Sequence, residues 1–163
     1  MKLNRHLNWR SALVGLYMLA FAVYIFFGLQ PTEATSYVKS AELLIPKIGL
    51  NSDVTALELG NDGLTTPAKI VGSYSQAENK TLLIGHSTSA FQNLNQINIG
   101  DEIYYNNKPY EVMAIDMKQK ADINMNELLS QSTKDTIVLM TCAGQLLEHG
   151  DATHRLIVYA SSE

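Results

Sequence analysis

The chain has one cysteine, Cys142, in 163 residues, so it cannot form an internal disulfide. It also lacks a basic stripe, because its 12 Lys and Arg residues are scattered among 16 Asp and Glu, for a formal charge of −4. No aromatic platform lies among these basic residues. Nucleic acid is therefore not an expected partner, and the single thiol is free for other chemistry.

One long apolar stretch carries no charge, the eighteen residues from Ala12 to Leu29, and Lys2, Arg5 and Arg10 precede it. As a helix it would measure roughly 27 Å, close to the roughly 30 Å thickness of a bilayer's hydrocarbon core. Because basic flanks stay in the cytoplasm, the domain after it is expected outside the cell. The predicted organisation is a cytoplasmic N-terminus, a transmembrane signal-anchor helix, a linker and one catalytic domain (1–11, 12–29, 30–40 and 41–163).

A cleaved signal peptide is the alternative for the same stretch, since Thr32, Glu33 and Ala34 leave a small residue at a possible cleavage point. The apolar run is longer than the 7 to 15 residues of an ordinary signal peptide, and no clear A-x-A site follows it. We therefore favour a retained anchor, although both interpretations place the domain outside the cell.

The remaining residues have the pattern of a β domain, with short β-rich runs interrupted by Gly, Asn, Asp and Pro. A hairpin is indicated at Asn106 and Asn107, between two apolar runs. One short helix is expected over 124–130, with Asn124 as its N-cap, and a second helical turn around Phe91 and Leu94. Seven or eight strands predict a sandwich or barrel; the candidates are 42–48, 53–57, 80–86, 102–105, 110–116, 136–142 and 155–160.

Three apolar runs carry a reactive or charged side chain at one end, namely His86, Cys142 and Arg155. A thiolate is nucleophilic, and an imidazole beside it can raise the productive thiolate fraction or protonate a leaving amine. Arg stays cationic and can donate hydrogen bonds to a developing oxyanion. The three residue types together are sufficient for acyl transfer.

These residues, with the runs around them, resemble the sortase family over residues 42 to 160. The family's motif before its cysteine begins with Thr where this chain has Val138. The resemblance is carried by Leu44 to Leu50, Leu83 to Ser87, Phe91, Leu94, Gly100 and Asp101, Val138 to Cys142, and Arg155 to Ala160.

The resemblance implies a mainly all-β fold, a closed eight-stranded sortase-type barrel with one or two short helices, preceded by one transmembrane helix. It implies that Cys142 is the nucleophile, His86 the acid/base and Arg155 the substrate and oxyanion stabiliser, with Thr141 and Ser87 contacting substrate. Sortases of Gram-positive-type bacteria cleave a C-terminal sorting motif of secreted proteins and hold the acyl group as a thioester. They then pass it to an amine on the cell wall or on a pilin.

No cofactor and no metal are expected. Some sortases bind calcium, and Asp116 and Asp122 are the candidate ligands, but two carboxylates fall short of the six to eight oxygens that calcium prefers. Two other interpretations stay open. One is a catalytically silent, membrane-tethered assembly or adhesion module, and the other is a zinc-binding domain; the zinc ligands would be Cys142, His149, Asp151 and His154.

Overall fold

The computed structural model describes residues 41–61, 63–148 and 150–162. The predicted cytoplasmic segment, transmembrane helix and linker (1–11, 12–29 and 30–40) lie outside these residues. Within the described part of the chain, none of the helices is both long and apolar enough to cross a bilayer.

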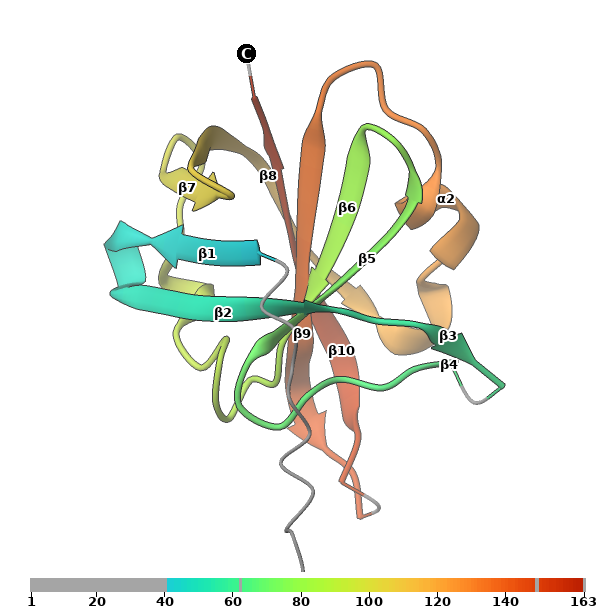
Figure 1. Ribbon diagram of the computed structural model, residues 1–163. Coiled ribbons are helices and arrows are strands. Elements are labelled where there is room, and N and C mark those ends of the chain that lie inside the picture. The colour runs from blue at the N-terminus through green and yellow to red at the C-terminus, as the bar shows by residue number, and fades with distance from the viewer. Residues whose placement is uncertain (1–40, 62, 149, 163) are drawn as a thin grey trace, which may run out of the picture. The chain divides into compact units, whose positions relative to one another are not determined.

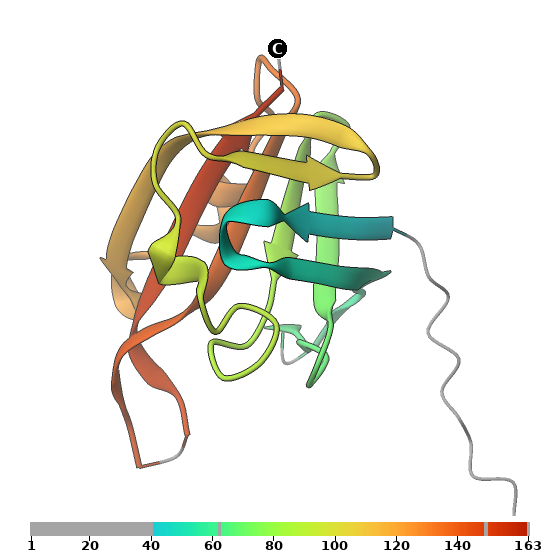
Figure 2. The same ribbon diagram turned by 90° about the vertical axis from the view of Figure 1, so that its left-hand side faces the viewer.

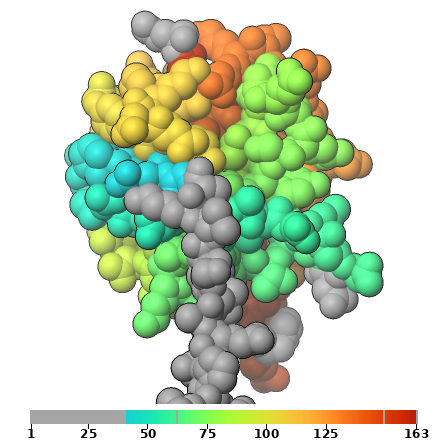
Figure 3. Space-filling view, viewed as in Figure 1, coloured from blue at the N-terminus to red at the C-terminus, as the bar shows by residue number. Residues whose placement is uncertain are grey.

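Eight of the strands close into a barrel, in the order β1-β2-β5-β6-β9-β10-β8-β7 (Figure 1). Two neighbouring pairs, β2–β5 and β6–β9, are parallel, and the others are antiparallel. Pairing of β1 with β7 closes the barrel, and Figure 3 shows the yellow β7–β8 hairpin directly against cyan β1. The predicted eight-stranded closed barrel is confirmed.

The strands of the barrel have these bounds: β1 Ala41–Ile45, β2 Leu50–Ala56, β5 Val71–Ala77, β6 Lys80–Ile84, β7 Glu102–Tyr105, β8 Lys108–Gln119, β9 Thr136–Leu146 and β10 Ala152–Ser161. A separate two-stranded sheet pairs β3 (Leu59–Gly60) with β4 (Gly63–Leu64). Helical elements are the 3-10 turns η1 (Pro46–Ile48), η2 (Leu94–Gln96) and η3 (Lys120–Asp122), and the α-helix α2 (Met125–Leu129).

Local signals account for several element ends. The prediction of one strand over 42–48 was wrong at its end, because Pro46 opens a 3-10 turn that stops at Gly49 in the left-handed region, with φ of 63°. The predicted hairpin is present, and Asn106 and Asn107 both have positive φ, as a two-residue turn requires. Asn124 caps α2 as predicted, since its side chain accepts bonds from two backbone N–H groups.

Two apolar clusters lie on opposite faces of β6, β9 and β10. The larger fills the barrel and includes Leu83, Leu139 and Val158. The smaller lies on the outer face, where α2 packs beside β6 (Figures 1 and 2), and consists of Leu82, Leu128, Val138, Met140 and Ile157. Because side chains alternate between faces along a strand, residues 82 and 84 share the outer face with 138, 140 and 142, and His86 is the next position of that alternation, just past the end of β6.

Candidate active site

Strand register sets Cys142 of β9 beside Arg155 of β10, and His86 follows just after the end of the neighbouring strand β6, so the three form one row. In the parallel β6–β9 pair Ile84 lies opposite Met140, so continuing that register by two residues sets His86 beside Cys142. In the antiparallel β9–β10 pair Cys142 lies directly opposite Arg155. Neighbouring strands are about 4.8 Å apart, so the three residues lie close together on the same outer face, with Cys142 in the middle.

Cys142 belongs to the interior of β9 rather than to its end. The prediction that the strand stops at Cys142 was wrong by four residues, because β9 continues to Leu146 as one arm of a long hairpin with β10. Gly144 makes this extension possible, since its φ is 79° and a Cβ there would lie 2.6 Å from side-chain atoms of Thr153 and His154. The thiol is half-buried.

His86 lies just beyond the end of β6, which stops at Ile84. Its backbone carbonyl accepts bonds from the N–H groups of Ser89 and Phe91, which fold the following turn back on it. A Cβ on Gly85 would lie 2.7 Å from the buried Phe91 ring, so only glycine permits this packing. The imidazole itself is exposed.

Thr141 joins the strand that carries the thiol to the turn that carries the imidazole. Its hydroxyl donates a 2.7 Å bond to the Gly85 carbonyl, and the side chain is buried, with 4% of its surface exposed. A second bond runs from the Gly85 N–H to the Met140 carbonyl. The residue before Cys142 is therefore hydrogen-bonded to the residue before His86, which restrains the positions of the two side chains relative to each other.

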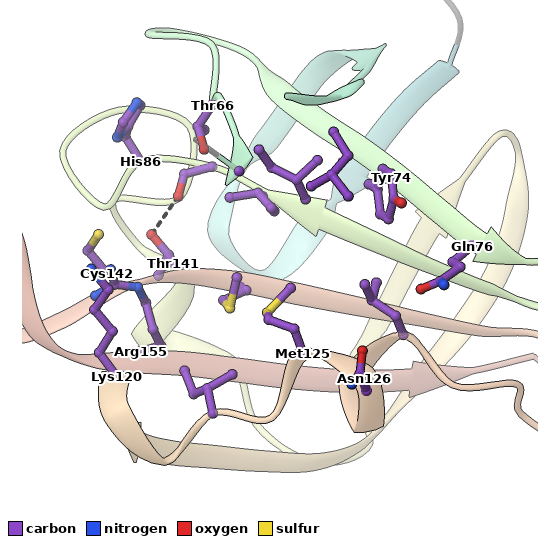
Figure 4. A pocket seen from close by; sticks show the side chains of 18 residues that line it. Thr66, Tyr74, Gln76, His86, Lys120, Met125, Asn126, Thr141, Cys142 and Arg155 are labelled. Atoms are coloured by element: carbon purple, nitrogen blue, oxygen red, sulfur yellow. Dashed lines mark hydrogen bonds between the residues drawn. The ribbon is translucent and has the colours of Figure 1, made fainter. Parts of the chain in front are cut away.

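The row lies at one end of a cavity of about 550 Å³ whose walls are largely apolar. Figure 4 shows Cys142 between His86 and Arg155 in that view, with the cavity extending toward Met125 and Asn126 of α2. Eighteen residues line it: Leu59, Gly63, Leu64, Thr66, Tyr74, Gln76, Ile84, Gly85, His86, Lys120, Ile123, Met125, Asn126, Leu129, Met140, Thr141, Cys142 and Arg155. This volume lies within the range of roughly 300 to 1,000 Å³ that is usual for ligand pockets.

Arg155 lies within β10 rather than at its start, and it is held by an acidic partner. Its Nη2 donates to Oδ1 of Asp151 at 2.7 Å, and Nη1 donates to the carbonyls of Ala152 and His154, both at 2.9 Å. Asp151 also pairs with Lys120 through Oδ2. The hydrogen bond from Lys120, then that from Arg155, lowers the pKa of Asp151 well below its ordinary value of 3.8.

The sequence had indicated Asp151 only as a candidate zinc ligand and had not indicated Lys120 at all. The four-residue spacing from Asp151 to Arg155 was the available signal for the ion pair, and nothing local connects either to Lys120. Ser87 is adjacent to His86 but is not among the residues that line the cavity, so its predicted substrate contact stays a prediction. Thr141 does line the cavity.

Within the described ranges, no three His, Cys, Asp or Glu side chains gather closely enough to share an ion. Cys142, Asp151 and His154 thus form no such group, and His149 lies outside these residues. The His154 ring bonds instead to the Thr153 hydroxyl at 2.8 Å, and Asp116 pairs with Lys118 at 3.9 Å.

Comparison with known proteins supplies the family. The model of the sortase domain matches residues 43–163. Similar solved structures include a lid mutant of sortase A from Corynebacterium diphtheriae (24% identity, TM-score 0.59) and a pilus-related sortase C of Group B Streptococcus (24% identity, TM-score 0.59). A sortase D5 transpeptidase of Clostridium perfringens is another (21% identity, TM-score 0.56).

All three alignments cover 76% of this chain, and they cover 69%, 66% and 78% of the respective structures. Among curated proteins, none matches the sequence. At these identities the structural likeness establishes the barrel, while the family model spans most of the chain. The chain therefore belongs to the sortase family of cysteine transpeptidases.

Proposed function

We propose that this chain is a membrane-anchored sortase that joins secreted proteins to an amine on the cell wall or on a pilin. One observation carries the proposal: a thiol, an imidazole and a guanidinium occupy one row at the end of a peptide-sized cavity. Each is supplied by a different strand or strand end, so their convergence is a property of the fold and not of sequence proximity.

In the first half-reaction the Cys142 sulfur attacks the carbonyl carbon of the scissile peptide bond. The thiol proton passes to His86 as the carbon–sulfur bond forms, and His86 gives that proton to the departing amine as the carbon–nitrogen bond breaks. The product is a thioester between the substrate's acyl group and Cys142. Because the row lies at the end of the cavity, the residues preceding the scissile bond have the apolar groove available to them.

Arg155 supplies positive charge where the substrate carbonyl becomes an oxyanion. Its side chain is 13% exposed, so its hydrogen bonds act in a partly desolvated site. The three bonds to described residues use at most three of its five N–H groups, which leaves at least two for the substrate.

In the second half-reaction an acceptor amine attacks the thioester carbonyl. His86 takes the amine's proton, a new amide bond forms, and the thiolate of Cys142 leaves. His86 is exposed, which gives an incoming amine access to it from solvent. The apolar run at 12–29, with its basic flank, supports an anchor with a cytoplasmic N-terminus and an extracellular catalytic domain.

The test uses the full chain in detergent, incubated with a mixed library of candidate sorting peptides and examined by intact-protein mass spectrometry. We expect a mass increase equal to one acyl fragment, located on Cys142 and removed by hydroxylamine or by an added amine. Cys142→Ala should form no adduct. Full turnover by that variant would refute the mechanism, and peptide binding by the wild type without an adduct would indicate a silent binding module instead.

A further inference from the structure

One carboxylate, that of Asp151, connects three separate segments at the end of the cavity. Oδ1 accepts from the Arg155 guanidinium and from the backbone N–H of Ala152, both at 2.7 Å. Oδ2 accepts from the Lys120 ammonium of η3. The Asp151 carbonyl in turn accepts from the N–H of Leu147, at the other arm of the hairpin, at 2.7 Å. Asp151 is itself held on both its backbone and its side chain.

Of the three side chains in the row, that of Arg155 is the longest and has the most rotatable bonds, so its orientation depends most on hydrogen-bond partners. Arg has a long side chain with about 2 kcal/mol of rotamer entropy, and it stabilises an oxyanion only when its planar fork is already oriented. Two backbone carbonyls fix Nη1, but both lie at the end of β10 close to Arg155 itself. Asp151 is the acceptor that fixes Nη2.

We propose that Asp151 is a positioning residue for Arg155, which orients the guanidinium so that its remaining N–H groups face the bond undergoing acyl transfer. The inference rests on the proposed function, because it concerns a residue that acts through Arg155 and not on substrate directly. A carboxylate beside the arginine would weaken an oxyanion site if it were alone. Here Lys120 shares it, and the three charges leave a net positive charge at the row.

The second carboxylate oxygen of Asp151, Oδ2, connects Asp151 to the wall of the cavity through Lys120. Lys120 lines the cavity and precedes Ile123 and Met125, which line it too. The link from Oδ2 to Lys120 therefore ties this wall to the oriented arginine. The Lys120 side chain is 58% exposed whereas that of Arg155 is 13% exposed. Added salt should therefore weaken the Lys120–Asp151 ion pair more than the Arg155–Asp151 pair.

The kinetic test compares the full-length wild type with Asp151→Asn and Asp151→Ala. Asn keeps an oxygen acceptor but loses the charge, and Ala loses both, so we expect kcat for thioester formation to fall by about 3 to 10-fold and by about 10 to 100-fold respectively. KM should change less than twofold, because the lost interaction is made in the transition state. Unchanged kcat in folded Asp151→Ala would overturn the proposal.

Asp135→Asn is the matched control. Asp135 also accepts from a lysine and a second donor, at 2.5 Å from Lys108 and 3.0 Å from the Tyr110 hydroxyl. It immediately precedes β9, seven residues before Cys142, which corresponds to roughly 20 Å along the strand. Removing its charge should leave kcat unchanged. An equal loss of kcat in Asp135→Asn and Asp151→Asn would mean that the effect is general destabilisation and would overturn the proposal.

A second measurement does not depend on activity. Nitrogen-15 NMR of the Arg155 guanidinium, assigned by its absence in Arg155→Lys, should show slow rotation and two resolved Nη signals in the wild type. Asp151→Ala should average them, whereas Lys120→Met should leave them resolved. Averaged signals in the wild type would overturn the inference even if the enzyme is active. Failure of every peptide to form a thioester, with resolved signals, would count against the proposed function alone.

Discussion

The two faces of β6, β9 and β10 differ in what covers them, although they come from alternate residues of the same strands. The inner face is packed throughout by Leu83, Leu139 and Val158, which are fully buried. The outer face is covered by α2 near Leu82 and Val138, and it opens two residues further along into the cavity. The inner face supplies rigidity, so the open end of the outer face can hold polar side chains in a fixed row.

Among the residues on the two faces, His86 is expected to show the largest effect on activity when it is replaced. Because the imidazole is exposed, His86→Ala should change the free energy of unfolding by no more than about 0.5 kcal/mol. Loss of the acid/base should nevertheless lower kcat/KM for transpeptidation by about 10² to 10⁴-fold. Urea denaturation and peptide turnover on the same preparations measure both. A variant that retains wild-type turnover would remove His86 from the chemistry.

On the inner face we expect the opposite, a large loss of stability with little change in kcat. Leu139→Ala leaves a cavity in the barrel and should cost about 2 to 5 kcal/mol of unfolding free energy. Its remaining folded fraction should keep kcat close to wild type. Leu146→Ala, at a position that is 76% exposed on the hairpin, is the control and should stay within about 0.5 kcal/mol. A cost below about 1 kcal/mol at Leu139 would show that the inner face is not the rigid side.

Periodicity and turn chemistry were enough to predict most of the barrel. The strand over 102–105, the Asn106 and Asn107 turn and the Asn124 cap all depend on local patterns, and all are present. β5 was missed because Val71–Ala77 is rich in Ser, Gly and Gln and shows no apolar alternation. It is a strand because β2 and β6 pair with it on either side, which is a tertiary effect that local sequence does not contain.

In the candidate site, too, some features follow from local sequence and others depend on tertiary contacts. Reactive residue types at the ends of apolar runs pointed to His86, Cys142 and Arg155, and the structure brings all three to one cavity. The link from Asp151 to Lys120 spans 31 positions, and it depends on η3 lying beside the β9–β10 hairpin. No local pattern encodes that proximity, so the partners of Arg155 could be read only from the folded chain.

Gly85 connects the two faces, because it packs against the buried Phe91 ring and directly precedes His86. In Gly85→Ala the new methyl group would lie 2.7 Å from the buried Phe91 ring, which cannot move without disturbing the core. We expect a loss of about 1 to 3 kcal/mol in unfolding free energy, and a fall in kcat as His86 shifts. Gly60→Ala is the control, because its nearest neighbour is a carbonyl at an ordinary 3.6 Å. Equal stability of both variants would exclude this close packing as a constraint on His86.

The smallest expected effect is the pH dependence of the ion cluster at the end of the row. The folded-state pKa of Asp151 is lowered by its bonds to Lys120 and Arg155, so folding favours the charged carboxylate. Its contribution is therefore complete above the ordinary pKa of 3.8 and is lost as pH falls below it. The stability advantage of wild type over Asp151→Asn should be about 0.2 to 1 kcal/mol between pH 5 and 8, the usual range for a partly exposed pair, and should shrink toward pH 2.5. Urea titrations at fixed ionic strength measure this difference, and an advantage that stays constant down to pH 2.5 would mean that Asp151 stabilises the fold through its shape and not its charge.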